Sequence, residues 1–93
     1  MPRQKVVNFY ASVANGSYVD LQPSGTATWL VFSIECSGAF ELRRVNGGNT
    51  IALGRVLGKA DFAVPIVVNN SNFLRLVNVS EATQHVAVTY FVD

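Results

Sequence analysis

The sequence predicts an all-β fold: a single antiparallel β-sandwich domain of about eight strands over residues 1–93, with jelly-roll topology as the leading arrangement. Short runs of Val, Ile, Leu, Phe and Tyr recur about eight times, and Gly, Pro, Asn or Ser bound each run. No apolar pattern of helical period separates them. A small barrel is the alternative arrangement. The eight strands are expected at residues 5–13, 17–22, 27–36, 39–45, 50–57, 62–68, 73–79 and 84–92.

The first two expected strands are joined by a short turn. In residues 5–13, alternate apolar side chains share one face, namely Val7, Phe9, Ala11 and Val13. The dipeptide Asn15-Gly16 then predicts a hairpin turn, because both residue types tolerate a positive φ. The second strand, residues 17–22, places Val19 and Leu21 on one face, and Pro23 with Gly25 predicts the next turn.

Residues 27–36 form the strongest expected strand. Its alternation predicts one unbroken apolar face, made of Leu30, Phe32, Ile34 and Cys36. Ser37-Gly38 is predicted to turn the chain into residues 39–45, where Phe40 and Leu42 point inward. The run Asn46-Gly47-Gly48-Asn49 is the clearest hairpin turn in the sequence.

The second half of the chain is expected to continue in the same way. Gly58-Lys59-Ala60-Asp61 is predicted to be a loop between the strands at 50–57 and 62–68. Pro65 cannot donate a backbone hydrogen bond, so residues 62–68 should form an edge or bulged strand. The last strand, residues 84–92, should place alternate apolar side chains on one face, namely Val86, Val88, Tyr90 and Val92.

The composition predicts that part of the surface is covered by another protein. The chain is 49% hydrophobic and only 14% charged, whereas charged residues make up about 25% of a typical domain. Two strands, 27–36 and 62–68, are apolar on both faces, and a sandwich buries only one face. The candidate interface residues are Trp29, Val31, Phe62, Val64, Ile66 and Val68. The alternative is a monomer with a Val-rich core and a surface of Asn, Ser and Thr.

Residues able to perform catalysis or bind metals are scarce. The single histidine, His85, has no evident partner nucleophile or acid, and Cys36 falls on an apolar face, where a thiol is unreactive. One His and one Cys cannot form a zinc site within one chain. The glycine-rich segments precede no helix that could bind a phosphate. We therefore expect no enzyme activity and no cofactor.

Other partner classes can be weighed from charge and hydropathy. The net charge is +1, and the basic residues form no stripe, so we do not expect nucleic-acid binding. The best candidates for it are the arginines Arg43, Arg44, Arg55 and Arg75 with Phe40 and Phe73. No apolar run approaches the about 20 residues of a membrane helix, and the polar start predicts no secretory signal. We expect synthesis in a cytoplasm and no contact with a membrane.

A carbohydrate-binding module is the main alternative function. Tyr10, Tyr18, Trp29 and Tyr90 could stack on sugar rings, as aromatic side chains do in many β-sandwich modules. A single Trp in an apolar strand is more often part of a core. An exposed Trp29 with sugar-sensitive fluorescence would favour sugar binding, and a buried, unresponsive one would favour a structural role.

Two stretches carry a resemblance to a known group of proteins. The sequence Asn15–Gly25, followed by Thr28–Val31, resembles a recurring opening of small phage virion proteins, in which a strand reaches a Pro-x-Gly turn and then a Trp-bearing strand. The segment Asn72–Asn78 and the final alternating strand are similar to the end of such proteins. The chain thus resembles the small β-sandwich decoration, or cement, proteins of tailed-phage capsids. The resemblance implies a homotrimer in the virion that binds the major capsid protein or another virion protein and has no catalytic residue.

Overall fold

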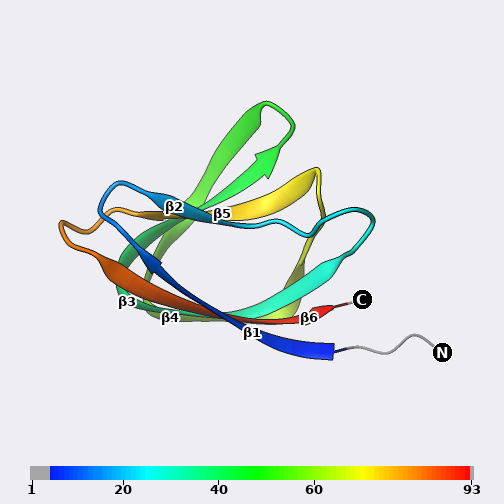
Figure 1. Ribbon diagram of the computed structural model, residues 1–93, viewed down its shortest axis with the longest axis horizontal. Helices are drawn as coiled ribbons and strands as arrows, with labels where there is room; N and C mark the ends of the chain where they lie inside the picture. The colour runs from blue at the N-terminus through cyan, green and yellow to red at the C-terminus, as the bar shows by residue number, and fades with distance from the viewer. Residues whose placement is uncertain (1–4, 93) are drawn as a thin grey trace.

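Residues 5–92 are described by the computed structural model, and they form a curled antiparallel sheet of six strands (Figure 1). The strands are β1 (Lys5–Val13), β2 (Tyr18–Leu21), β3 (Trp29–Asn46), β4 (Asn49–Val68), β5 (Asn72–Asn78) and β6 (Gln84–Val92). Their order is β1-β6-β3-β5-β2, and β4 pairs with β3. The prediction of an all-β antiparallel fold is confirmed.

The long strand β3 has neighbours on both of its edges. Its first part, Trp29–Cys36, pairs with β6, and its second part, Phe40–Asn46, pairs with β5. Along its other edge, β3 pairs with β4 from Trp29, opposite Val68, to Asn46, opposite Asn49. The sheet therefore folds over into two layers that share β3 and β4. Figure 1 shows the β1/β6 layer below and the β2/β5 layer above.

Two predicted breaks between strands are wrong, because the chain bends there without reversing. Ser37-Gly38 lies inside β3, at a register shift between Glu35 and Ala39. The predicted loop at residues 58–61 lies inside β4, where Lys59 pairs with Glu35. Gly58 has a φ of +88°, which glycine adopts without steric cost and which kinks a strand. Glycine produces bends here, so the predicted eight strands become six.

The two Asn–Gly turns have different outcomes. Asn46 pairs with Asn49 across Gly47-Gly48, so the predicted hairpin is confirmed. At Asn15-Gly16 a turn forms, with Gly16 at a φ of +78°, but it does not make a hairpin. The strands that it joins pair elsewhere, β1 with β6 and β2 with β5.

The core lies between the two layers. The predicted inward faces of β1, β2 and β6 and of the second part of β3 are confirmed, since their apolar side chains are buried or packed against the core. The predicted face of Leu30, Phe32, Ile34 and Cys36 is confirmed for Ile34 and Cys36, which face the core, and wrong for Leu30 and Phe32. A bulge between Val31 and Ser33 shifts the alternation, so Val31 and Ile34 are fully buried. The fully buried apolar side chains include Leu21, Val31, Ile34, Phe40, Val68, Leu74, Leu76, Val86 and Val88.

Asn78 is the one buried polar side chain among the described residues, with 1% of its surface exposed. Its amide nitrogen donates to the carbonyl oxygens of Val13 and Ala82, at 2.8 and 2.9 Å. Its Oδ1 accepts from the backbone nitrogen and hydroxyl of Ser80, at 2.9 and 2.7 Å. Asn78 therefore ties the end of β1 to the connection between β5 and β6.

We expect Asn78→Ala to lower the free energy of unfolding by about 3 kcal/mol, because it leaves several backbone groups without partners. Urea denaturation followed by circular dichroism measures the change. The control is Asn8→Ala, at an exposed site whose amide makes one hydrogen bond, to Thr89. It should cost less than about 0.5 kcal/mol. Equal losses in the two variants would show that the Asn78 network does not stabilise the fold.

Candidate functional site

The most unusual surface of the molecule lies along β4. Of its 20 residues, only Val56 and Val68 are buried. Nine large apolar side chains of the described residues are strongly exposed, and five of them lie on this strand. We call these five the β4 surface: Ile51, Leu53, Leu57, Val64 and Val67. Apolar side chains gathered on one element in this way are typical of a protein interface.

The exposure of β4 follows from its position at the edge of both layers. β4 pairs with β3 on one side and has no partner strand on the other within residues 5–92. Ile66 still pairs with Val31, and Asp61 pairs with Ser33, but residues 62–65 between them have no partner in β3. Val64 in this segment is 82% exposed. The prediction of an edge or bulged strand around Pro65 is thereby confirmed.

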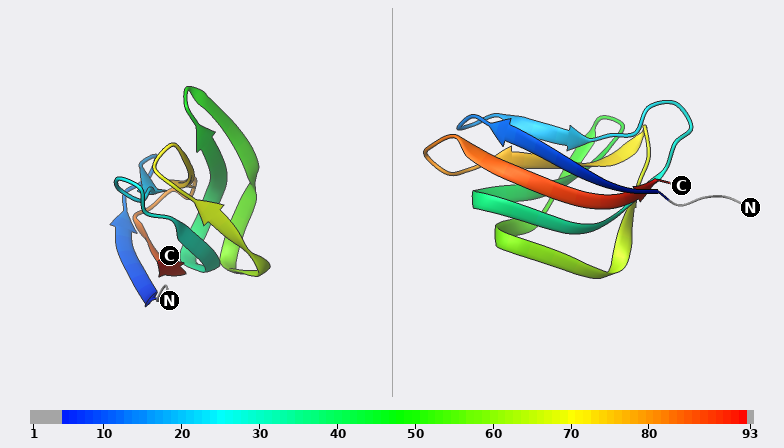
Figure 2. Two further views of the ribbon diagram at one scale, coloured as in Figure 1. Left: turned by 90° about the vertical axis from the view of Figure 1, so that its right-hand side faces the viewer. Right: turned by 60° about the horizontal axis from the view of Figure 1, so that its bottom comes forward.

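The hairpin of β3 and β4 extends the β4 surface away from the core. Figure 2 shows this hairpin, in green, projecting from the rest of the molecule. Ile51 and Leu53 lie on its β4 side and are at least half exposed. At Gly54, with a φ of +140°, the pairing with β3 shifts register. The shift twists the hairpin, because a bulge increases the local twist.

The structure places the predicted interface residues in three different environments. Val64 is exposed, and Trp29, Phe62 and Ile66 are partly buried. Val31 and Val68 are fully buried, so their assignment to an interface is wrong: both lie in the core, opposite Ile66 and Trp29 respectively. Four exposed residues of β4 were not predicted from the sequence, namely Ile51, Leu53, Leu57 and Val67. The sequence pattern at these positions is apolar alternation. Alternation alone does not show whether another strand covers the strand that carries it.

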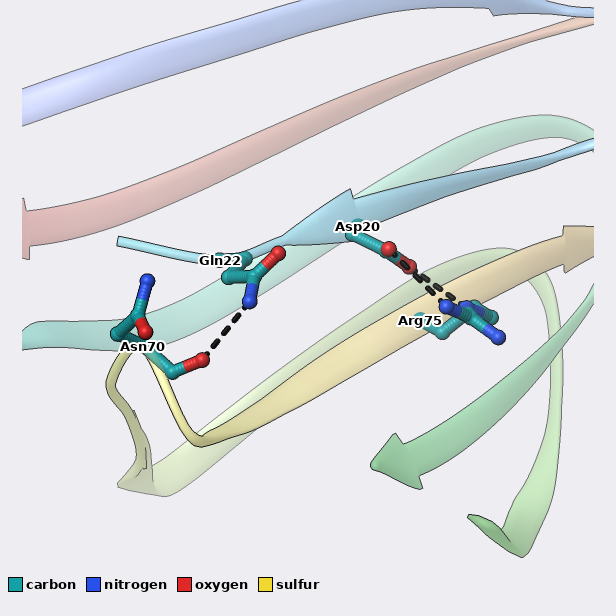
Figure 3. A network of polar contacts seen from close by, with 4 residues as sticks. All are labelled: Asp20, Gln22, Asn70 and Arg75. Carbon is teal, nitrogen blue, oxygen red and sulfur yellow. Dashed lines mark hydrogen bonds and ion pairs between the residues drawn. The ribbon is translucent and has the colours of Figure 1, made fainter. Parts of the chain in front are cut away.

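A charged cluster occupies the outer face of the β2/β5 layer. Nε and Nη2 of Arg75 donate to the carboxylate oxygens of Asp20, at 2.7 and 3.2 Å. The guanidinium carbon also lies 4.0 Å from the centre of the Tyr18 ring. The hydrogen bond to Asp20 raises the pKa of Arg75. Figure 3 shows this pair beside the hydrogen bond from Gln22 to the carbonyl oxygen of Asn70.

Three of the four arginines considered for nucleic-acid binding are engaged by other side chains. Arg43 lies opposite Arg75 in the sheet, but Glu41 pairs with Arg43 as Asp20 pairs with Arg75. Arg44 instead donates to the side chain of Asn72, at 2.6 Å. The aromatic partners considered with them, Phe40 and Phe73, are both buried. No aromatic ring of that set is therefore available to stack on a base.

A shallow depression of about 350 Å³ lies on the outer face of the β1/β6 layer. The rings of Tyr10 and His85 stack at its side, with their centres 5.7 Å apart. Glu35 and Ser37 also line it. Ser37 donates to Gln84 and accepts from the backbone nitrogen of His85, both at 2.8 Å. The hydroxyl is thus already used to hold β3 against β6.

Cys36 and His85 both border this depression, but Cys36 is poorly suited to nucleophilic attack. The thiol is partly buried. Burial raises the pKa of Cys36 from 9.0 to about 11. Only the thiolate is a strong nucleophile, so the thiol is unreactive at neutral pH. This agrees with the expectation from the sequence that Cys36 is a small apolar residue.

The candidate sugar-stacking residues are not grouped together. Tyr90 is 6% exposed and stacks on Trp29, with the ring centres 4.3 Å apart. Its assignment as a contact for sugar is wrong, because its ring lies in the core between the layers. Tyr10 and Tyr18 are exposed, but they lie on different layers. Of the four residues, Tyr10 is the one that lines the depression described above.

No protein-family model matches this chain, and no curated protein matches it at a significant level. Within residues 5–92, no three His, Cys, Asp or Glu side chains lie close enough to share a metal ion. The same part of the chain contains no helix that could cross a membrane.

We expect iodoacetamide to alkylate Cys36 in the folded protein about 100-fold more slowly than in urea at pH 8, because raising a pKa by two units lowers the thiolate fraction by that factor. The urea-unfolded chain is the matched reference, since it contains the same single thiol. Mass spectrometry over time measures both rates. Equal rates would show that the folded thiol is accessible and ionised. A Cys36–His85 pair could then act as a nucleophile and base.

Proposed function

We propose that this chain is a non-enzymatic structural protein of a virus particle, which self-associates and adheres to the capsid in the manner of a decoration protein. The observation that carries the proposal is the β4 surface. It combines a free backbone edge with five exposed apolar side chains on one strand. Another protein that covers this strand would remove apolar area from water, which is the main driving force of association.

Adhesion of this kind needs no active site. A small subunit that binds its neighbours through a modest interface gains strength when symmetry repeats that interface over a particle. The partners in this proposal are further copies of the chain and the major capsid protein or another virion protein. The protein would be made in the host cytoplasm and function in the virion. The resemblance implies a trimer, and the number of copies can be measured directly.

We also propose that the fold is a jelly roll built from six strands. One layer has the order β1, β6, first part of β3, second part of β4, and the other has β2, β5, second part of β3, first part of β4. Every connection crosses between the layers except the hairpin at Asn46–Asn49. A jelly roll with eight strands has this order when β3 and β4 are each counted as two strands. The fold occurs in viral capsid proteins, which supports the proposed role at the level of analogy.

We expect the double variant Leu57→Asp/Val64→Asp to remain folded and to lose self-association. Both side chains are more than 70% exposed, so the charges replace apolar contacts between molecules and disturb no core packing. Light scattering over a range of concentrations measures the mass. The control is Val6→Asp, which places a charge at an exposed valine on β1. A control that dissociates equally, or a wild-type protein that is monomeric at high concentration, would contradict the proposal.

A second candidate function is carbohydrate binding at the Tyr10 depression. Tyr10 is 69% exposed, and Glu35 offers a carboxylate beside it. An aromatic ring next to a hydrogen-bond acceptor suits a sugar, which has apolar C–H faces and hydroxyl groups. In this case the chain would be a lectin-like module of a phage fibre or tail.

The carbohydrate alternative has its own test. A glycan array with the wild-type protein should give a signal that Tyr10→Ala abolishes and Tyr18→Ala preserves, because Tyr18 lies on the other layer. Array signals that both variants retain, or no signal at all, would leave adhesion between proteins as the function that the surface supports.

A further inference from the structure

The free edge of β4 is complementary to itself. We propose that two copies of the chain pair their β4 strands in antiparallel fashion about Gly58, forming a symmetric dimer with a sheet that continues from one molecule into the other. This inference rests on the proposed self-association and specifies its partner, its symmetry and its register. An edge strand offers a row of unpaired N–H and C=O groups, and a second edge strand can satisfy them.

The positions of the charged residues favour one register for this β4–β4 pairing. Arg55 and Asp61 lie three residues to either side of Gly58. In an antiparallel pair centred on Gly58, Arg55 therefore faces the partner's Asp61, and symmetry repeats the contact. Arg55 has no ion pair within residues 5–92, whereas Arg43, Lys59 and Arg75 each have one. The dimer would supply the carboxylate that Arg55 lacks in the single chain.

The direction of the side chains agrees with this register. Arg55 lies opposite Glu41 on β3 and Asp61 lies opposite Ser33, and both are exposed on the outer face. Residues directly opposite each other in a sheet point to the same face. The outward Arg55 therefore meets the partner's outward Asp61. Leu57, which is 73% exposed, faces the partner's Lys59, whose aliphatic stem can cover it.

The inward side chains agree as well. Val56 lies opposite Phe40 and is buried, and Ala60 lies opposite Ile34 and packs against the core. In the proposed register Val56 faces the partner's Ala60. Small apolar side chains thus meet on the inner face, and opposite charges meet on the outer face. No buried charge and no exposed apolar pair results.

A second register, centred on Ala60, is less favourable. It would place Lys59, which already has Asp61 of its own chain 3.7 Å away, opposite the partner's Asp61, and would leave Arg55 without a facing carboxylate. It would also place Arg55 opposite the partner's Pro65, which has no N–H group. Pro65 belongs to the segment that leaves the pairing with β3. In the pairing about Gly58, the contacting residues 55–61 of both strands lie outside that segment.

The experiment is a charge swap at Arg55 and Asp61. Arg55→Asp places two carboxylates opposite each other at each contact, and Asp61→Arg places two guanidinium groups there. Each variant alone should dimerise roughly 10- to 100-fold more weakly than the wild type, because like charges replace opposite charges twice in the interface. An equimolar mixture of the two variants should form a one-to-one heterodimer, since both contacts are then attractive. Light scattering gives the mass, and native mass spectrometry gives the composition.

Two controls accompany the swap. Glu81→Arg changes a charge at an exposed site in the connection between β5 and β6, and it should leave dimerisation unchanged. Circular dichroism of each variant should match the wild type, because Arg55 and Asp61 are exposed. The restored heterodimer is itself a check on folding, because unfolded chains would not recover association when mixed.

The outcomes separate this inference from the proposed function. A wild-type trimer, or single variants that associate as well as the wild type, overturns the pairing about Gly58. If Leu57→Asp/Val64→Asp still dissociates such an assembly, adhesion through the β4 surface stands and only the symmetric register falls. A wild-type monomer at all concentrations overturns both.

Discussion

The whole arrangement depends on the hydrogen-bonded ladders of β3. This strand pairs with β4 along one edge, and with β6 and then β5 along the other. The bend at residues 36–39 directs the two parts of β3 into different layers, and the core fills the space between them. The bend is tightly packed: a Cβ on Gly38 would lie 2.5 Å from the side chain of Gln84. The hydroxyl of Ser37 bonds the same glutamine.

Because β3 and β4 run through both layers, β4 is the outer strand of each. Within residues 5–92, neither layer has a further strand beside β4, so its backbone edge and its apolar side chains stay exposed together. Natural proteins commonly protect such edges with proline, bulges or charges. β4 has all three, with Pro65, the register shifts at Gly54 and Gly58, and the charges of Arg55, Lys59 and Asp61. These features limit disordered association and favour one defined register.

Much of the fold could be predicted from local pattern, and the exceptions have physical causes. Alternation identified the inward face of the last strand, and Asn46–Asn49 identified its hairpin, because both signals depend on neighbours in sequence. Ser37-Gly38 and Gly58 were misread because glycine permits a bend in a strand as readily as a reversal. The bulge after Val31 shifts the alternation of β3, so Leu30 and Phe32 do not share the core-facing side of Ile34 and Cys36. Of the β4 surface, only Val64 was predicted from the sequence. The other four residues were missed because exposure depends on which strands pair, and those pairings join residues far apart.

The charged side chains, like the exposed apolar ones, indicate β4 as the strand that another chain would contact. Arg75 is held by Asp20 and Arg44 by Asn72, so these two contacts link neighbouring strands, whereas Arg43 is held by Glu41 of its own strand. Arg55 differs from them, since no ion pair or side-chain hydrogen bond within residues 5–92 involves it. It lies between Leu53 and Leu57, in the middle of the apolar edge. A charge without an ion pair in residues 5–92, a row of exposed apolar side chains and a free backbone edge thus coincide on β4. A protein interface accounts for all three together, because each is a group that another chain can pair or cover.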